Sequence, residues 1–414
     1  MSNLTGKIKS VKNFRETGKT VLLRTDYNMS LTPVNGFIDD TRLQSSLPTI
    51  EYLLSLHSKI IILAHKGRPK GKKSTEESMH DIAQYLAQKL HKKFVEVEDE
   101  TKSFPNYPVP HVIFYRGDVR RLTREKIDSE LQPGNILFLE NIRFYPEEES
   151  DISGFSKKLA ALADVFVNEG FSVAHHASAS TVGLTEYLPK YAGLQLIKEV
   201  ETLEHIQKNA SKPFVIVAGG AKISEKVKML ETLLPQADYL LVGGAMANLF
   251  FKVKDFNIGD SLYEQEGVLA ASNLLRNFKE KIVLPVDVVI GRREGVSAEV
   301  KAASSVRPGE KILDIGPQSI LKYADIIKTA QTIVWNGPMG LFEEKNFSHG
   351  TTSLARLIAS RGMGEAFVVV GGGETLEAVH QVKMKESIDF VSTGGGAMLS
   401  FLGGEELPGL TSLV

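Results

Sequence analysis

The sequence contains no cysteine and only one tryptophan among its 414 residues. Without cysteine, disulfide bonds, a thiolate nucleophile and cysteine-based zinc or iron–sulfur sites are excluded, and a reducing, cytosolic location is favoured. No apolar run reaches the roughly 18 residues that a membrane span needs, since the longest, at 239–251, is interrupted by glycine and asparagine. The N-terminal residues lack the apolar core of a secretory signal. We therefore expect a cytoplasmic protein with no membrane partner.

The sequence also lacks an excess of charge of either sign. It has 49 Lys and Arg against 50 Asp and Glu, a formal net charge of -1. Such a balance argues against a protein that coats nucleic acid or lies on an anionic membrane. The length predicts two or three domains.

Short apolar, β-branched runs alternate with segments of helical spacing along the whole chain. This alternation predicts βαβ units and parallel sheets, and the number of strands favours two sheets over one. The fold class we predict is α/β, with two doubly wound, Rossmann-like parallel-sheet domains joined by a hinge helix at 194–208. We place the domain boundary near 188–191, so that the domains are 1–188 and 189–399. The predicted strands are 21–24, 60–64, 112–115, 136–139, 165–167, 214–218, 239–242, 282–286, 312–315, 333–335, 367–370 and 390–392.

Basic and polar residues follow the predicted strands of the first half. Ligands of doubly wound sheets bind beyond the carboxyl ends of the strands, and arginine and histidine there favour a small, highly anionic ligand. The adjacent His175 and His176 are expected to diverge rather than to bind a metal, and the acidic run 147–149 is expected to be a solvated turn. The residues concerned are Arg24, Asp26, Asn28, Arg42, His65, Arg68, Glu140, Asn141, Arg143, Asn168, Glu169, His175 and His176.

Glycine instead follows the predicted strands of the second half. Glycine between a strand and a helix lets the backbone approach phosphate oxygens at the helix N-terminus. Lys222 and Lys226 are expected on one face of a helix at 222–234, where they would meet a polyphosphate. The pattern predicts a nucleotide site, although GxxxxGK[ST], GxGxxG and GxSxG are all absent. The glycine clusters are at 219–220, 243–244, 316, 337, 371–373 and 394–396.

An anion site in one domain and a nucleotide site in the other predict phosphoryl transfer across a cleft. That reaction needs alignment, exclusion of water and donors aimed at the transferred group, which a closing hinge supplies.

At these residues the sequence resembles the phosphoglycerate kinase family over essentially its whole length. The motifs that carry the resemblance include VLLRTDYNMS, ILAHKGRPKG, LENIRFYPEEE, KPFVIVAGGAKISEKVKML, VWNGPMGLFE and FVSTGGGAMLSFLGGEELPG. The resemblance implies a glycolytic, cytoplasmic, monomeric kinase that moves a phosphoryl group between 1,3-bisphosphoglycerate and ADP, giving 3-phosphoglycerate and ATP with Mg²⁺. It also implies that 400–414 folds back onto the first, phosphoglycerate-binding domain.

The resemblance implies a role for each matching position. Arg42, Lys222 and Gly395 would act on the transferred phosphoryl group, and Glu374 would bind the metal. The phosphoglycerate would be held by Arg24, Asp26, Asn28, Arg42, His65, Arg68, Arg143, His175 and His176. The nucleotide would be held by Gly219, Ala221, Lys222, Lys226, Gly243, Asn336, Pro338, Glu343, Gly372, Gly373, Glu374 and Thr375.

Several positions depart from the family pattern. His176 stands where the family has a phosphate-binding arginine, and Glu374 replaces the metal-binding aspartate. Two alternatives therefore stay open: a divergent relative that binds nucleotide as a non-catalytic scaffold, and a kinase for another small carboxylate. The further departures are Ser30, Glu169, Gly170, Ser172, Ser178, Glu225 and Ser400.

Overall fold

The computed structural model describes residues 4–32, 39–150, 152–291 and 298–414. The chain forms two compact units, which are residues 1–201 with 406–414 (unit 1) and residues 202–405 (unit 2). The division falls inside helix α6 (Leu194–Asn209). Among the described residues, no helix is both long and apolar enough to cross a membrane.

Unit 1 is built on a seven-stranded parallel sheet in the order β3-β4-β5-β2-β1-β6-β7. Its central strands are mostly apolar and almost entirely buried, as expected for strands covered on both faces. The strands are β1 (Thr20–Arg24), β2 (Lys59–Leu63), β3 (Lys93–Val97), β4 (His111–Tyr115), β5 (Ile136–Leu139), β6 (Val165–Asn168) and β7 (Lys190–Ala192). The helices are α1 (Thr41–Ser55), α2 (His80–Lys89), α3 (Arg124–Glu130), α4 (Glu147–Ser150), α5 (Ile152–Ala160) and α14 (Pro408–Thr411).

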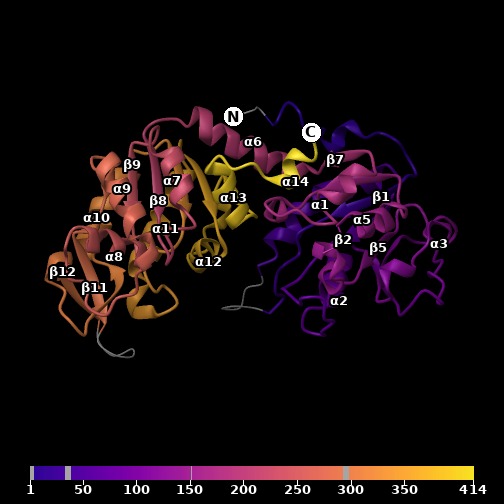
Figure 1. The fold of residues 1–414 in the computed structure, drawn as a ribbon, viewed down its shortest axis with the longest axis horizontal. Coiled ribbons are helices and arrows are strands. Elements are labelled where there is room, and N and C mark those ends of the chain that lie inside the picture. Colours follow the sequence, from indigo (N-terminus) through magenta and orange to yellow (C-terminus); the bar gives the residue numbers. More distant parts are fainter. Residues whose placement is uncertain (1–3, 33–38, 151, 292–297) are drawn as a thin grey trace. The chain divides into compact units, whose positions relative to one another are not determined.

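The C-terminal helix α14 returns to unit 1. Gly409 N–H donates to the carbonyl of Ala174 (2.8 Å), and Lys190 Nζ donates to the carbonyl of Ser412 (2.6 Å). Leu407, Leu410 and Leu413 are buried there. Figure 1 shows α14, in yellow, next to the label of β7.

Unit 2 contains a six-stranded parallel sheet, in the order β10-β9-β8-β14-β15-β16, and a separate three-stranded antiparallel sheet, β12-β11-β13. Helices α8, α10 and α11 pack against the smaller sheet (Figure 1). The strands are β8 (Phe214–Ala218), β9 (Tyr239–Val242), β10 (Ile282–Val283), β11 (Asp287–Gly291), β12 (Ala298–Ala302), β13 (Lys311–Ile315), β14 (Thr332–Asn336), β15 (Phe367–Gly371) and β16 (Phe390–Ser392). The helices are α7 (Val227–Leu233), α8 (Gly244–Val253), α9 (Val268–Phe278), α10 (Pro317–Ile327), α11 (His349–Gly362), α12 (Gly373–Gln381) and α13 (Gly395–Leu402).

The predicted α/β class with parallel sheets is confirmed, and two details of the prediction are wrong. The strand expected at 312–315 lies in the antiparallel sheet, not in a parallel one, and the run 282–286 holds only the two-residue β10. The segment near 188–191, where the sequence placed the domain boundary, overlaps β7, which pairs with β6. The assignment of one ligand to each domain stays a prediction.

Candidate functional site

Arg24 and His65 lie together at the carboxyl end of the unit 1 sheet. Arg24 is only 1% exposed; its Nε donates to Ser180 Oγ (2.8 Å), and its guanidinium lies 3.3 Å from Nδ1 of His65. Burial, and after it the positive charge of Arg24, hold the pKa of His65 well below its ordinary value. His65 therefore stays neutral at neutral pH and can act on a ligand through hydrogen bonds rather than through charge.

Asp26 forms hydrogen bonds with α1 and with the segment that follows β6. Its carboxylate accepts hydrogen bonds from Arg42, near the start of α1, from the Ser172 hydroxyl, and from the backbone N–H of Asn28 (2.9 Å). Burial by itself would raise the pKa of Asp26, but Arg42, His65 and these hydrogen bonds outweigh it and lower the pKa. Asp26 is therefore an ionised carboxylate that orients the Arg42 guanidinium.

The loop at Gly67 is fixed by two of the predicted residues. Asn28 Oδ1 accepts from the Gly67 N–H (2.9 Å), and an Arg143 guanidinium nitrogen donates to the Gly67 carbonyl (2.8 Å). The backbone N–H of the neighbouring Arg68 donates to the Glu77 carboxylate (2.9 Å). The Arg68 side chain is exposed. These contacts bring Arg68 and Arg143 to one pocket.

This pocket of about 730 Å³ is lined by five basic side chains, Arg24, Arg68, Lys70, Arg143 and His176. Carboxylates are also present in the wall, at Glu148 and Glu149. The basic residues nevertheless outnumber them, and arginine suits bidentate binding of phosphate or carboxylate. The pocket can hold a small anion with more than one charge.

Glu148 contradicts the expectation of a solvated turn at 147–149. It is 3% exposed, and its carboxylate accepts from Ser178 Oγ (2.7 Å), Ser180 Oγ (2.6 Å) and Ser180 N–H (3.0 Å). Burial raises the pKa of Glu148, opposed by Arg24 and the Ser180 bonds. Helix α4 turns this residue inward, so that Glu148 and Arg24 share Ser180 as a hydrogen-bonding partner.

The histidine pair also differs from expectation, because a turn places the rings of His175 and His176 together, with centroids 3.8 Å apart. His175 is half-buried, and burial followed by His176 lowers its pKa, while His176 is exposed at the pocket. Over the part of the chain that the structure describes, no group of three or more His, Cys, Asp and Glu residues could hold a metal ion.

In unit 2 the glycines at the strand ends permit close backbone packing. A side chain at Gly219 would strike the Pro338 carbonyl, and one at Gly337 (φ +96°) would strike the Gly219 carbonyl. The Gly243 position likewise lies against Met339. The carboxyl ends of β8 and β14 are thus in contact through backbone alone.

A second set of contacts fixes the loop between β15 and α12. Asn336 Nδ2 donates to the Gly371 carbonyl (2.7 Å), and Thr375 Oγ1 accepts from the Gly337 N–H (2.7 Å). A Cβ built on Gly395 would lie 3.2 Å from Gly372, so the starts of α12 and α13 are neighbours. Gly373, the first residue of α12, has open space around it. Two helix N-termini at one place form an anion-binding environment.

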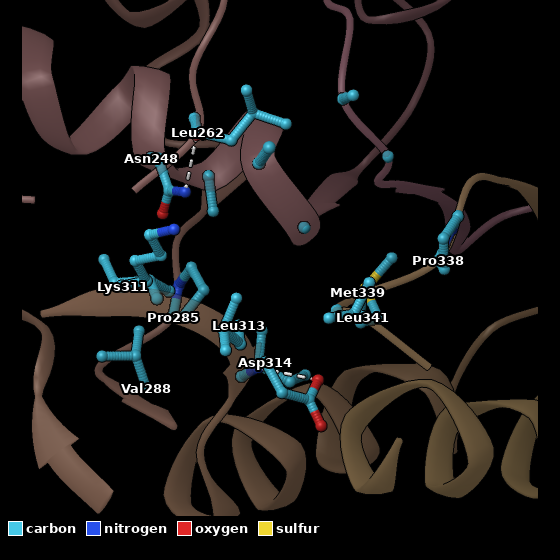
Figure 2. A pocket seen from close by; sticks show the side chains of 18 of the residues that line it. Asn248, Leu262, Pro285, Val288, Lys311, Leu313, Asp314, Pro338, Met339 and Leu341 are labelled. Atoms are coloured by element: carbon cyan, nitrogen blue, oxygen red, sulfur yellow. Dashed lines mark hydrogen bonds between the residues drawn. The ribbon is translucent and has the colours of Figure 1, made fainter. Parts of the chain in front are cut away.

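These loops border a pocket of about 450 Å³ within unit 2 (Figure 2). Gly220, Ala221, Pro338, Glu343 and Glu374 belong to its wall, together with residues of α8 and β13. Its other wall residues are mostly apolar, among them Leu262, Val288, Leu313, Met339 and Leu341. Clefts of this kind, apolar with a few polar groups, are typical of small-molecule sites.

Asp314 is an acidic member of this wall that the sequence did not identify. It is 2% exposed and accepts from the backbone N–H groups of Gly350 (2.7 Å) and Ile315 (2.9 Å). Burial raises the pKa of Asp314 to about 7, and the two hydrogen bonds limit the rise. It joins α11 to β13 behind the pocket.

The two predicted lysines do not share a helix face, because α7 begins at Val227. In the turn before α7, Glu264 accepts hydrogen bonds from the backbone N–H (3.0 Å) and the hydroxyl of Ser224. Lys226 is 6% exposed, and burial lowers its pKa. Lys222 is exposed, and its Nζ lies 3.4 Å from Glu225 Oε1.

Glu374 is the predicted metal ligand. A Cβ built on Gly220 would lie 3.8 Å from Lys226 Nζ and 4.0 Å from Glu374 Oε2, so a phosphate chain beside Gly220 would meet both groups. Glu374 is exposed, and Mg²⁺ is commonly bound through one carboxylate, phosphates and waters. The residues present fit a nucleotide-bound Mg²⁺.

Comparisons with known proteins agree over the whole chain. The family model described as Phosphoglycerate kinase matches residues 11–405. The chain is 38% identical over 411 residues to the phosphoglycerate kinase of Coprothermobacter proteolyticus, covering 99% of both chains. It is 41% identical over 413 residues to that of Desulfosudis oleivorans, covering 98% of both. The solved phosphoglycerate kinase of Coxiella burnetii is similar in fold, with a TM-score of 0.79, 36% identity and 98% coverage of both chains.

Proposed function

The chain belongs to the phosphoglycerate kinase family and is a glycolytic phosphotransferase, and from this premise we propose the ligands and the residues through which it acts. The reaction is the reversible transfer of a phosphoryl group between 1,3-bisphosphoglycerate and ADP, which yields 3-phosphoglycerate and ATP. The single observation on which the acceptor assignment rests is the unit 1 pocket with its five basic side chains.

Phosphoglycerate carries a phosphate and a carboxylate, which match the guanidinium groups of Arg24, Arg68 and Arg143. Asp26 and Asn28 act on the site through their hydrogen bonds to Arg42 and to the Gly67 loop. The ring nitrogens of His65, His175 and His176 are further hydrogen-bonding groups for phosphoglycerate. The occupant of the 450 Å³ pocket is the nucleoside of ADP or ATP, with Glu343 near the ribose and the glycine loops along the phosphates.

In the direction of ATP synthesis, a terminal oxygen of ADP attacks the phosphorus of the acyl phosphate. The bond from that phosphorus to the acyl oxygen breaks, and the electron pair leaves with 3-phosphoglycerate as a carboxylate. No proton is transferred, so no general base is needed, and catalysis consists of positioning and charge stabilisation. We assign that stabilisation to Arg42, Lys222 and the N-terminus of α13 at Gly395.

Mg²⁺ bound at Glu374 together with the nucleotide would neutralise phosphate charge during transfer. We further propose a cytoplasmic monomer whose two units move about α6 during the cycle. The absence of cysteine supports the location. Light scattering during size-exclusion chromatography tests the monomer.

A coupled assay with 3-phosphoglycerate, ATP and Mg²⁺ tests the function. The Arg68→Met variant removes one charged contact to the anion, so its KM for 3-phosphoglycerate should rise about 10- to 150-fold. Arg276→Met, on α9 in unit 2, is the matched control and should leave that KM unchanged.

His176 and Ser178 depart from the family pattern, and these departures are the reason to test two other functions. If folded protein binds ADP in calorimetry but shows neither 3-phosphoglycerate binding nor turnover, the chain is a nucleotide-binding scaffold. If another small carboxylate is phosphorylated with a higher kcat/KM, the acceptor we name is wrong.

A further inference from the structure

Glu264 binds the turn that carries Lys222, one of the residues assigned to the transferred phosphoryl group. One oxygen of its carboxylate accepts from the Ser224 N–H (3.0 Å), and the other accepts from the Ser224 hydroxyl. Ser224 lies midway along the chain between Lys222 and Lys226. The proposed function uses both lysines and gives Glu264 no role.

Glu264 itself lies in a segment of unit 2 that is fixed on both sides. Before it, Ser261 Oγ accepts from the backbone N–H of Ile312 on β13 (2.8 Å). After it, Gly267 packs so closely against the fully buried Ile223 that a Cβ at Gly267 would strike the Ile223 side chain. Because the segment is anchored before and after Glu264, the carboxylate is a fixed point to which the turn at Ser224 is bound.

The Glu264 carboxylate is ionised at neutral pH. Burial by itself would raise the pKa of Glu264, but the hydrogen bonds from Ser224 and the charge of Lys222 outweigh burial and lower the pKa. Two donors of one residue therefore meet two oxygens that can only accept. Hydrogen bonds to an ionised group are stronger than neutral ones, which suits them to fix an exposed turn.

The two lysines of this turn differ in how their side chains are held. Lys226 is buried, so its surroundings restrict its side chain. Lys222 is exposed, and a lysine carries its charge on a flexible four-carbon stem. The direction of the Lys222 ammonium therefore depends on the backbone from which it extends, and Glu264 fixes that backbone through Ser224.

We propose that Glu264 is a positioning residue for phosphoryl transfer: by binding Ser224 it fixes the turn from which Lys222 reaches the transferred group. Glu264 acts through Lys222 and needs no contact with either substrate. This inference rests on the proposed function and names the residue that orients one of its charged groups. The alternative is an electrostatic role, in which the carboxylate repels ATP and its removal lowers the KM for ATP.

Steady-state kinetics of the full-length enzyme test this role. Glu264→Leu removes both acceptors, and kcat should fall about tenfold, the lower end for a hydrogen bond to a charged group. The KM for 3-phosphoglycerate, which we assign to unit 1, should change by less than about twofold. A fall in the KM for ATP with kcat unchanged would assign the electrostatic role and overturn the proposal.

Glu264→Gln separates hydrogen bonding from charge. A glutamine can accept from the Ser224 N–H and donate to its hydroxyl, so kcat should stay within about twofold of the wild type. Glu266→Gln, at an exposed position of the 3₁₀ helix Gln265–Gly267, is the matched control for the lost charge and should leave kcat unchanged. An equal fall of kcat in Glu264→Gln and Glu264→Leu would overturn the proposal.

A double-mutant cycle with Lys222→Met distinguishes positioning from a merely structural role. If Glu264 acts through Lys222, adding Glu264→Leu to Lys222→Met should lower kcat by less than about twofold further. A structural defect would instead multiply with the loss of the lysine, and that result would overturn the proposal.

Ser224→Ala keeps the proposal testable if Glu264→Leu does not fold, because Ser224 is exposed. It removes only the hydroxyl bond, so kcat should fall about threefold, within the range for one hydrogen bond. An unchanged kcat in Ser224→Ala would overturn the proposal. Failure of the proposed function is a separate result: a wild type that does not phosphorylate 3-phosphoglycerate overturns both, whereas an active wild type with unaffected variants overturns this inference alone.

Discussion

His176 is the side chain at which the anion pocket departs most from the family pattern. It is exposed in the wall that also contains Arg24, Arg68 and Arg143. In His176→Arg, a permanently charged guanidinium with up to five donors replaces an imidazole ring. We expect the KM for 3-phosphoglycerate to fall at least about tenfold, the lower end for a charged hydrogen bond.

Steady-state kinetics with 3-phosphoglycerate varied at saturating ATP measure this change. His91→Arg, at an exposed position of unit 1 outside the pocket, is the control for the added charge and should leave the KM unchanged. An unchanged KM in His176→Arg would show that position 176 does not contact the acceptor.

Glu169 should make stability depend on pH. It is 5% exposed, and its carboxylate accepts from the backbone N–H groups of Gln195 and Leu196 (both 3.3 Å) at the start of α6. Burial raises the pKa of Glu169 from its ordinary value of 4.5 to about 8. Between these values the unfolded chain has lost the proton and the folded chain keeps it. The contribution of Glu169 to stability therefore falls as pH rises, by up to about 1.4 kcal/mol per pH unit.

Glu169→Gln removes this titration. The unfolding free energy of the variant relative to the wild type should rise between pH 5 and pH 8 and level off above pH 8, as measured by denaturant unfolding. Glu51→Gln, at an exposed position on α1, should show no such trend. A constant difference between Glu169→Gln and the wild type across this range would contradict the pKa shift.

Single residues also show what the sequence could and could not reveal. The structure brings Arg24, Arg68, Arg143 and His176 to one pocket because each lies at or beyond the carboxyl end of a strand, and strand ends can be identified from apolar runs. Glu148 and Asp314 could not be found in this way. Their roles depend on burial and on partners distant in sequence, which the local pattern does not contain.

At the scale of secondary structure, the apolar strands were predictable, including the edge strand β16, whereas the strands rich in charged residues were not. The runs that form β1, β2 and β8 are continuously apolar because both faces are covered. By contrast β3 is mostly half-buried and β12 is mostly exposed, and both carry charged residues, so their sequences resemble loops. The contact between Ser224, in the turn before α7, and Glu264 was equally hidden, since these residues are 40 positions apart in the sequence.

The turn after β14 should be destabilised even by a single methyl group at Gly337. Gly337 has a φ of +96°, and a Cβ there would strike the Gly219 carbonyl. Gly337→Ala should therefore lower the unfolding free energy by at least about 2 kcal/mol, from backbone strain and from the displaced strand end.

Thermal and denaturant unfolding measure this effect. Gly373→Ala is the matched control, because Gly373 has no positive φ and no atom within 4 Å of a built Cβ. It should change stability by less than about 1 kcal/mol. Equal losses in the two variants would show that the contact between the ends of β8 and β14 does not limit stability.

At the scale of the whole molecule, each unit has its own apolar core. The core of unit 1 includes Val21, Ile60 and Phe138, and that of unit 2 includes Val215, Trp335 and Val368. Unit 1 is made of two separate stretches of chain, because residues 406–414 complete it. The last residues of the sequence therefore contribute to the stability of the unit that contains the anion pocket.

This organisation predicts that core truncations act on one unit at a time. Leu410, in α14, is fully buried, and α14 bonds to Ala174, the residue before the histidine pair. Leu410→Ala should destabilise unit 1 by about 2–5 kcal/mol. Hydrogen exchange should consequently lose protection in β1 and β6, while β8 and β14 keep theirs. The mirror variant Leu402→Ala, in α13 of unit 2, should give the reverse pattern, because Leu402 is equally buried. Loss of protection in both units from either variant would mean that the whole chain unfolds as one cooperative body.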